Sequence, residues 1–166
     1  MSIFNYQPRA SHEVRIGHRP LGGDHPLRLQ SMTTATTTDT EACVAQCKRI
    51  FDAGADYVMT QICYDADRIL AFIGRCREAG ITVPIIPGIK PLSTLRHLEI
   101  LPETFGVKLP EELVREVKAH PDGVREVGTE WAIAQSRELM AAGVPVLHYY
   151  TMSRTTNIQK IVKAVF

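Results

Sequence analysis

The sequence predicts an α/β protein, a partial (β/α)8 TIM-barrel-like domain with about four parallel βα units. Short apolar runs alternate along the chain with longer segments whose apolar residues recur at helical spacing. Such alternation is typical of a parallel sheet with right-handed crossovers. A complete barrel of this kind needs at least about 200 residues. The 166 residues of this chain therefore predict an incomplete barrel or an open sheet.

Four strands are predicted, at residues 27–31, 57–61, 83–87 and 146–150. The second strand lies between Gly54 and the polar pair Thr60 and Gln61, as expected of a short strand that is buried on both faces. The third strand is apolar and β-branched, and its internal prolines place it at a strand end or a bulge.

Helices are predicted between and after these strands. Thr38 followed by Glu41 forms a capping box that starts the first helix, which ends before Gly54. Asp65 caps the second helix, which ends at Gly80. The remaining helices are predicted at residues 93–100, 110–120, 122–142 and 155–166.

The predicted domain organisation is simple. Residues 1–26 form a lead-in segment rich in Arg, His, Pro and Gly, and residues 27–166 form a single domain. The N-terminus has neither the apolar core nor the cleavage site of a secretory signal, so we expect a cytoplasmic protein.

Composition excludes several classes of function. Lys and Arg number 19 against 18 Asp and Glu, a formal net charge of +1, which does not favour a nucleic-acid partner. No apolar run approaches the ~20 residues that span a bilayer. The four cysteines lack the paired spacing of a metal site, so we expect reduced thiols and no metal.

Candidate ligand contacts follow the predicted strands, because a crevice for a small molecule lies outside the carboxyl ends of parallel strands. Gln61 ends the second strand, Lys90 follows the third, and Arg154 follows the last. His97 lies in the helix after the third strand. Each residue also has a purely structural interpretation: Gln61 bonded to a neighbouring loop, His97 at the rim, and Arg154 and Lys90 solvated at the surface.

From about residue 55 to 166 the chain resembles the C-terminal part of bacterial methylenetetrahydrofolate reductase. The resemblance is carried by the runs ADYVMTQICYD, AGITVPIIPGIKPLST and VGTEWAIAQSRELMAAGVPVLHYYTMSR. It implies a (β/α)8 barrel and an oxidoreductase of one-carbon metabolism and methionine biosynthesis. Such an enzyme is a flavoprotein that uses FAD and NAD(P)H to reduce methylenetetrahydrofolate to methyltetrahydrofolate.

The same resemblance assigns substrate-binding residues. Gln61 matches the strand-end glutamine that contacts the pterin, and Arg154 matches the arginine after the last strand that helps to hold the substrate. The sequence departs from the family at two positions, with His97 in place of a second glutamine and Leu101 in place of a mobile phenylalanine.

From about residue 13 to 55 the chain resembles a different family. The run VRIGHRPLGGDHPLRLQSMTTATTTDTEACVAQCKRIFDAGAD looks like the N-terminus of 4-hydroxy-3-methylbut-2-enyl diphosphate synthase, a flavodoxin- or ferredoxin-dependent enzyme of isoprenoid biosynthesis. Both families carry a string like DAGADYV before a barrel strand, so we expect the seam of a chimeric chain within residues 52–58.

These two resemblances leave three possible functions for the chain. The first is a truncated reductase that does not turn over methylenetetrahydrofolate alone, because the strands that bind FAD in that family are absent from the resemblance. The second is a remnant of the synthase. The third is a non-catalytic α/β module that binds a pterin or a nucleotide. Exposed sheet edges predict a homo-oligomer in each case.

Overall fold

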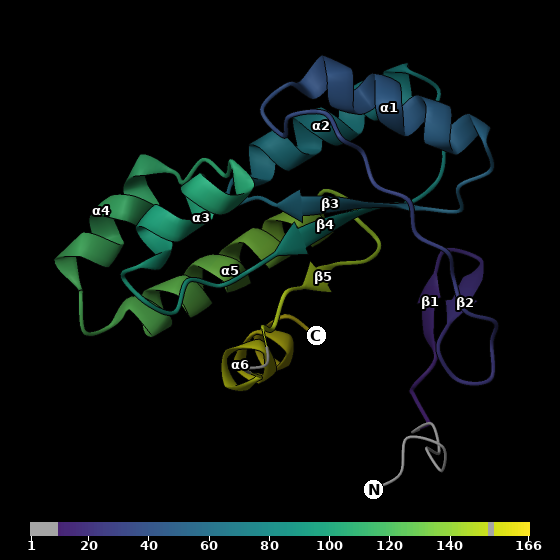
Figure 1. The fold of residues 1–166 in the computed structure, drawn as a ribbon. Helices are drawn as coiled ribbons and strands as arrows, with labels where there is room; N and C mark the ends of the chain where they lie inside the picture. The colour runs from purple at the N-terminus through teal and green to yellow at the C-terminus, as the bar shows by residue number, and fades with distance from the viewer. Residues whose placement is uncertain (1–9, 153–154) are drawn as a thin grey trace, which may run out of the picture. The chain divides into compact units, whose positions relative to one another are not determined.

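A computed structural model describes residues 10–152 and 155–166 of the chain (Figure 1). It divides into two compact units, Met1–Met32 and Thr33–Phe166, which are described separately. The domain boundary that the sequence predicts between residues 26 and 27 stays a prediction. No helix in the described ranges is both long and apolar enough to cross a membrane.

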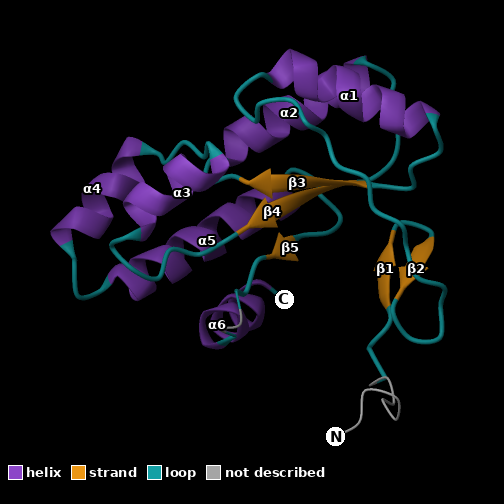
Figure 2. Cartoon of the chain, viewed as in Figure 1, coloured by secondary structure: helices purple, strands orange, loops and turns teal. Residues whose placement is uncertain are grey.

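The first unit contains a short antiparallel hairpin. Strand β1 (Val14–Ile16) pairs with β2 (Arg19–Leu21), and the two arrows are drawn in orange in Figure 2. Gly17 has a φ of 58°, a left-handed conformation that favours glycine in a tight turn. The alternating run at residues 13–16 therefore reflects one strand of a hairpin.

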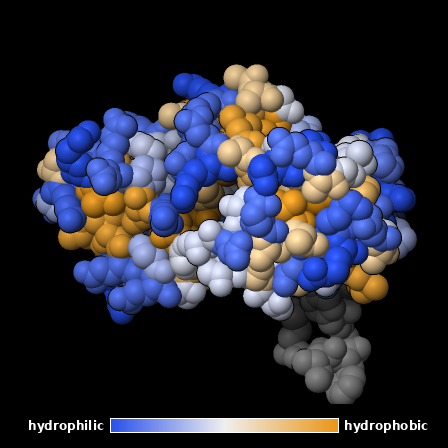
Figure 3. All heavy atoms as spheres, turned by 90° about the horizontal axis from the view of Figure 1, so that it is seen from above, coloured by the Kyte–Doolittle hydropathy of each residue, from blue (hydrophilic) through white to orange (hydrophobic). Residues whose placement is uncertain are grey.

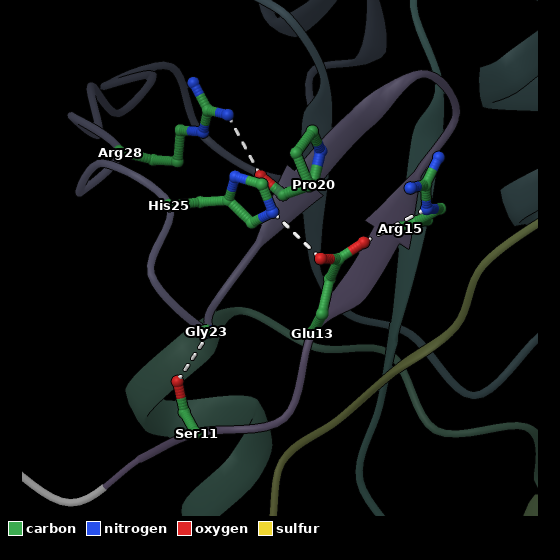
Figure 4. A network of polar contacts seen from close by, with 7 residues as sticks. All are labelled: Ser11, Glu13, Arg15, Pro20, Gly23, His25 and Arg28. Atoms are coloured by element: carbon green, nitrogen blue, oxygen red, sulfur yellow. Dashed lines mark hydrogen bonds and ion pairs between the residues drawn. The ribbon is translucent and has the colours of Figure 1, made fainter.

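Polar contacts tie the chain after the hairpin to the hairpin itself (Figure 4). The Glu13 carboxylate accepts a hydrogen bond from Arg15 Nε at 3.1 Å and pairs with His25 Nε2 at 2.8 Å. These partners, His25 foremost, lower the pKa of Glu13. Arg28 donates to the carbonyl of Pro20 at 2.9 Å, so the segment after the turn folds back onto β2.

The strand predicted at residues 27–31 is wrong. Leu27 and Leu29 are 96% and 102% exposed, and no strand is assigned between them. Their alternation with polar residues is the pattern of a strand, but a strand forms only where a neighbour satisfies its backbone. Here the intervening Arg28 bonds to the hairpin instead, and both leucines face solvent.

The second unit is built on a three-stranded parallel sheet within the described residues. Strands β3 (Val58–Ile62), β4 (Ile85–Ile89) and β5 (His148–Tyr149) lie in the order β3-β4-β5, and all five residues of β4 are buried. Both pairings are parallel, which confirms the last three predicted strands and their direction. The described part forms an open sheet with two free edges and no closed barrel.

Strand β5 is shorter than the predicted 146–150 because of Pro87 in β4. The N–H of Gly88 and its carbonyl both bond toward β3, so the alternation of a strand turns Pro87 toward β5. A proline has no N–H to donate to that neighbour. The β5 pairing therefore begins only at Gly88 opposite His148.

A β-bulge lies in β3 opposite Pro87. Met59 pairs with Ile86 and Ile62 with Gly88, so two residues of β3 face one of β4. The hydroxyl of Thr60, within the bulge, accepts the Gly88 N–H at 3.0 Å. The sequence predicted that its prolines would place the third strand at a strand end or a bulge. Pro84 directly precedes β4, and the bulge opposite Pro87 lies in the partner strand β3.

The second unit contains six helices in the described part of the chain. The last three strands are each followed by helix, as predicted, and the predicted segments 110–120, 122–142 and 155–166 are confirmed. The helices are α1 (Thr40–Asp52), α2 (Ala66–Glu78), α3 (His97–Phe105), α4 (Glu111–Ala119), α5 (Val124–Ala141) and α6 (Thr156–Val165).

Two helix starts differ from the prediction. The Asp39 carboxylate caps α1 by accepting the N–H of Ala42 at 3.0 Å, so the predicted capping box of Thr38 and Glu41 is wrong. The helix begins at Thr40, so Asp39 and not Thr38 is the N-cap, and Ala42 and not Glu41 is the third helical residue. Helix α3 starts at His97, four residues after the predicted Ser93. Asp65 caps α2 as predicted, accepting the Arg68 N–H at 3.1 Å.

The helices cover one face of the sheet. Ile85 and Ile89, which share a face of β4, pack against α1 and α2 and against α2, α5 and α6, whereas Met59 and Gln61 on the other face of β3 are exposed. One cluster joins α1 and α2 to Ile85, a second joins α2, α5 and α6 to Ile89, and a third joins α3 and α4 to the start of α5. Seen from above, hydrophilic residues separate the exposed apolar areas (Figure 3).

Gly128 in α5 allows the loop after β4 to lie directly on the helix. A Cβ atom at Gly128 would come within 2.2 Å of the Leu92 carbonyl oxygen and 2.7 Å of the Leu92 nitrogen. Leu92 is fully buried. The absence of a side chain at Gly128 therefore allows the backbone at Leu92, two residues after Lys90, to pack directly against α5.

We expect Gly128→Ala to destabilise the protein by about 1–3 kcal/mol, because the added methyl group displaces a buried backbone segment. The free energy of unfolding in urea measures this change. Gly74→Ala is the matched control, since Gly74 is also helical but a Cβ there meets no atom within 4 Å. The control gains up to about 1 kcal/mol from helix propensity. Equal changes in the two variants would contradict the packing argument.

We expect Thr60→Val to cost about 1–3 kcal/mol of unfolding free energy, because the buried N–H of Gly88 loses its acceptor. Valine has the shape of threonine without the hydroxyl oxygen. Thr60→Ser keeps that oxygen and should retain most of the stability. If the serine variant were as unstable as the valine variant, the hydroxyl would not be the cause.

Candidate functional site

A cleft of about 640 Å³ opens at the carboxyl ends of β4 and β5. Its wall comes from the segment after β4, the starts of α3 and α5, and the segment from β5 into α6. This is where a parallel sheet places its ligands. The lining residues are Lys90, Pro91, Ser93, Thr94, His97, Arg125, Tyr150, Thr151, Met152, Thr155, Thr156, Asn157 and Ile158.

Lys90 follows β4 directly and is only 8% exposed. Among the described residues, its ammonium group has no hydrogen bond or ion pair. Burial lowers the pKa of Lys90, because the charged form is poorly solvated there. The structure thus contradicts a fully solvated lysine at this position.

His97, the first residue of α3, lies in the same wall. Its Nδ1 accepts the backbone N–H of Ser93 at 3.2 Å, so the neutral ring carries its proton on Nε2. Burial lowers the pKa of His97, and the charge of Lys90 lowers it further. The arrangement favours a neutral imidazole that can donate one hydrogen bond.

Tyr149 and Tyr150 project into different cores, as expected of neighbours on a strand. The hydroxyl of Tyr149 bonds to Ser136 of α5 at 2.8 Å, and that of Tyr150 donates to the carbonyl of Thr60 at 3.2 Å. Tyr150 also meets the ring of His148 edge to face, with centroids 4.6 Å apart. The aromatic wall of the cleft is therefore anchored to the bulge in β3.

The structure brings together only part of the predicted site. His97 lines the cleft beside Lys90. Gln61 is exposed at the carboxyl end of β3, its Oε1 accepts the N–H of Ile62 at 2.9 Å, and it does not line the cleft. Arg154 lies outside the described residues. The roles assigned to all three by resemblance stay predictions.

Sequence reasoning missed Arg125, which lines the cleft from the first turn of α5. A signal was available: a cation in the first turn of a helix opposes the helix dipole, which favours acidic residues there. Thr155 and Thr156, which bring the start of α6 to the cleft, were assigned only to a helix.

The four cysteines form no disulfide in the structure. Burial raises the pKa of each thiol, to about 11 for Cys76, so none is a thiolate at neutral pH. Within residues 10–152 and 155–166 no group of three potential ligands is placed to hold a metal ion.

We expect Lys90→Met to raise the pKa of His97 toward its ordinary value of 6.5, because it removes the second of the two causes that lower the pKa. An NMR titration of the His97 ring measures this. The folded pKa lies below the unfolded one, so His97 contributes its full stability above pH 6.5 and loses it as pH falls through the folded pKa. That acid-induced loss should be smaller in Lys90→Met. A pKa unchanged by the substitution would contradict the coupling.

Comparison with known protein families identifies one family over most of the chain. The family model described as methylenetetrahydrofolate reductase matches residues 24–165. Methylenetetrahydrofolate reductase 1 of Schizosaccharomyces pombe is 36% identical over 130 residues, which are 76% of this chain and 21% of that protein. The chain thus matches about a fifth of this relative's length. Similar plant and nematode proteins carry NADH or NADPH in their names.

A second set of relatives matches part of the chain. The 4-hydroxy-3-methylbut-2-en-1-yl diphosphate synthase (flavodoxin) of Bacteroides fragilis is 47% identical over 91 residues, which are 54% of this chain and 14% of that protein. The two matched lengths, 130 and 91 residues, add up to more than the 166 residues of the chain, so the two matches overlap. The synthase match is also longer than residues 13–55, so the synthase resemblance extends beyond that segment.

The fold has a solved counterpart. A protein from Clostridium thermocellum, described as binding two copies of 5-methyl-5,6,7,8-tetrahydrofolic acid, superposes with a TM-score of 0.50 over 77% of this chain and 48% of that protein. The sequence identity is 15%, so the likeness concerns the fold alone. With the family match over residues 24–165 and the identity to the yeast reductase, the chain belongs to the methylenetetrahydrofolate reductase family.

Proposed function

We propose that this chain binds a reduced folate at the carboxyl ends of its sheet, in the cytoplasm, as the folate-binding part of a methylenetetrahydrofolate reductase. The observation that carries the proposal is the family match over residues 24–165, which spans all three strands and every residue of the cleft. The cleft is also of the size that small ligands occupy.

His97, Gln61 and Arg154 are the proposed substrate contacts. His97 supports the proposal best, because its neutral ring can donate from Nε2 to a carbonyl or ring nitrogen of a pterin. Gln61 would have to exchange its bond to Ile62 for one to the ligand. Arg154 would pair with a carboxylate of the folate, a strong charge-assisted contact.

The described lining of this cleft does not fit a bound FAD. The cleft is lined by a single aromatic side chain other than His97, that of Tyr150, and by no carboxylate. No second described aromatic residue flanks the cleft to enclose an isoalloxazine ring. The reductase reaction of the family depends on flavin and nicotinamide, so we propose that this chain alone binds folate without reducing it.

We expect 5-methyltetrahydrofolate to bind with a dissociation constant near about 1 mM, or about −4 kcal/mol. Isothermal titration calorimetry measures it. His97→Ala should weaken binding, because a donor in the cleft is lost. His120→Ala is the control, since His120 directly follows α4, is exposed, and its ring pairs with Glu116 outside the cleft.

The catalytic part of the proposal has a separate assay. Oxidation of NADH by a quinone acceptor, with excess FAD added to the purified protein, should not exceed the rate without protein. Stoichiometric uptake of FAD, or turnover that disappears in Gln61→Ala, would overturn the proposal of a non-catalytic chain. Equal folate binding by His97→Ala and His120→Ala would remove the cleft from the folate proposal.

We also propose that the chain joins segments of two families within residues 52–58. The match to the Bacteroides synthase, at a higher identity than the reductase match, supports a contribution from that family. Sequencing of genomic DNA and transcript across these codons tests this; two separate reading frames would refute a joined chain.

Self-association is the last part of the proposal. In the described part of the chain the outer edges of β3 and β5 are unpaired, and such edges accept strands from other chains. Sedimentation equilibrium should show a homo-oligomer. A monomer at all concentrations would contradict it.

A further inference from the structure

We propose that the cleft beside β4 holds a compact anion, a carboxylate or phosphoryl group, on the ammonium group of Lys90. This site does not rest on the folate proposal, because an anion can bind Lys90 whether or not a pterin occupies the rest of the cleft. The argument rests on the burial of Lys90, the charges around it and the helix ends that meet there.

Lys90 is the first part of the argument. Its side chain is more than nine-tenths buried, lines the cleft, and has no hydrogen bond or ion pair within the described residues. Burial of the residue lowers the pKa of the Lys90 ammonium group, because the charged form loses part of its solvation, and that loss costs free energy. An anion in the cleft would remove the cost, whereas a structural lysine would have a carboxylate beside it.

The charged residues that line the cleft also favour an anion. Arg125 adds a second cation, and the described lining contains no Asp or Glu. His97 adds a neutral donor through Nε2. Hydroxyl groups of Ser93, Thr94 and the threonines near α6 supply further donors. The cleft is thus rich in donors and carries positive charge without a compensating carboxylate of its own.

Helix starts meet at the same place. The residues around the starts of α3, α5 and α6 all line the cleft, and none of these three helices has a side-chain cap. Outside the cleft, α1 and α2 are capped by Asp39 and Asp65, and α4 has no side-chain cap. The N–H groups of His97, Leu98 and Glu99 at the start of α3 already bond to carbonyls of the preceding turn. Within the described residues, the starts of α5 and α6 are left to offer N–H groups and a partial positive charge, which favour a bound anion.

Carboxylate and phosphoryl groups share the chemistry that this cleft recognises, and two probes separate them. Inorganic pyrophosphate represents the phosphoryl class, and a triglutamate peptide represents the carboxylate class. Each is titrated calorimetrically into the purified chain at low ionic strength, in a buffer without phosphate, because surface attraction is screened by salt.

We expect at least one probe to bind saturably, and Lys90→Met to weaken that binding by at least about tenfold, because it removes a charged donor. Lys163→Met is the matched control. Lys163 is exposed on α6 outside the cleft, and its loss should change binding by less than about twofold. The probe that binds more tightly identifies the class. Failure of both probes to bind, or equal losses in the two variants, would overturn the site.

Thermal unfolding shows whether Lys90→Met loses binding because it lacks the ammonium group or because it folds less stably. Without an anion, Lys90→Met should melt at the same temperature as the natural chain or at a higher one, because a poorly solvated charge is replaced by an apolar side chain. The bound probe should raise the melting temperature of the natural chain and not that of Lys90→Met. A lower melting temperature of Lys90→Met without the probe would show that the ammonium group serves the fold, and the proposal would fail.

Discussion

The backbone of Gly88 is the point on which the second unit depends. Its N–H bonds to the hydroxyl of Thr60, its carbonyl accepts the N–H of Cys63, and it pairs with His148 of β5. A Cβ at Gly88 would lie 2.7 Å from both the Thr60 carbonyl oxygen and the ring of Tyr150. Only a residue without a side chain lets the bulge of β3 and the end of β5 approach β4 this closely.

The close packing around β4 explains how a lysine comes to lie in the interior. Gly88 brings the neighbouring strands onto the end of β4, and Gly128 brings the backbone of Leu92 onto α5. Lys90 lies in the sequence between Gly88 and Leu92, the two positions at which these close contacts occur, and it is buried with them. The fold thus holds a cation where burial disfavours it, a cost that proteins commonly bear at sites of function.

Local patterns were sufficient for most elements of this unit. The strands at β3 and β4, the cap of Asp65 and helices α4, α5 and α6 all follow from periodicity and capping chemistry. The pattern at Leu27 and Leu29 predicted a strand just as clearly and failed, because pairing needs a neighbour that no local pattern specifies. A local pattern likewise selected Gln61 at a strand end, but its side chain accepts the N–H of Ile62 at the bulge and lies outside the cleft.

The sequence by itself determined the α/β class, the parallel direction of the strands and the carboxyl end as the ligand side, because these depend on periodicity and on the handedness of crossovers. It also placed His97 among the candidates. Only the tertiary structure decided that His97, Lys90 and Arg125 share one wall, since they are separated along the chain and meet through helix packing. Burial without a partner, which distinguishes Lys90 from an ordinary surface lysine, is a property of the packed surroundings and leaves no mark in the sequence.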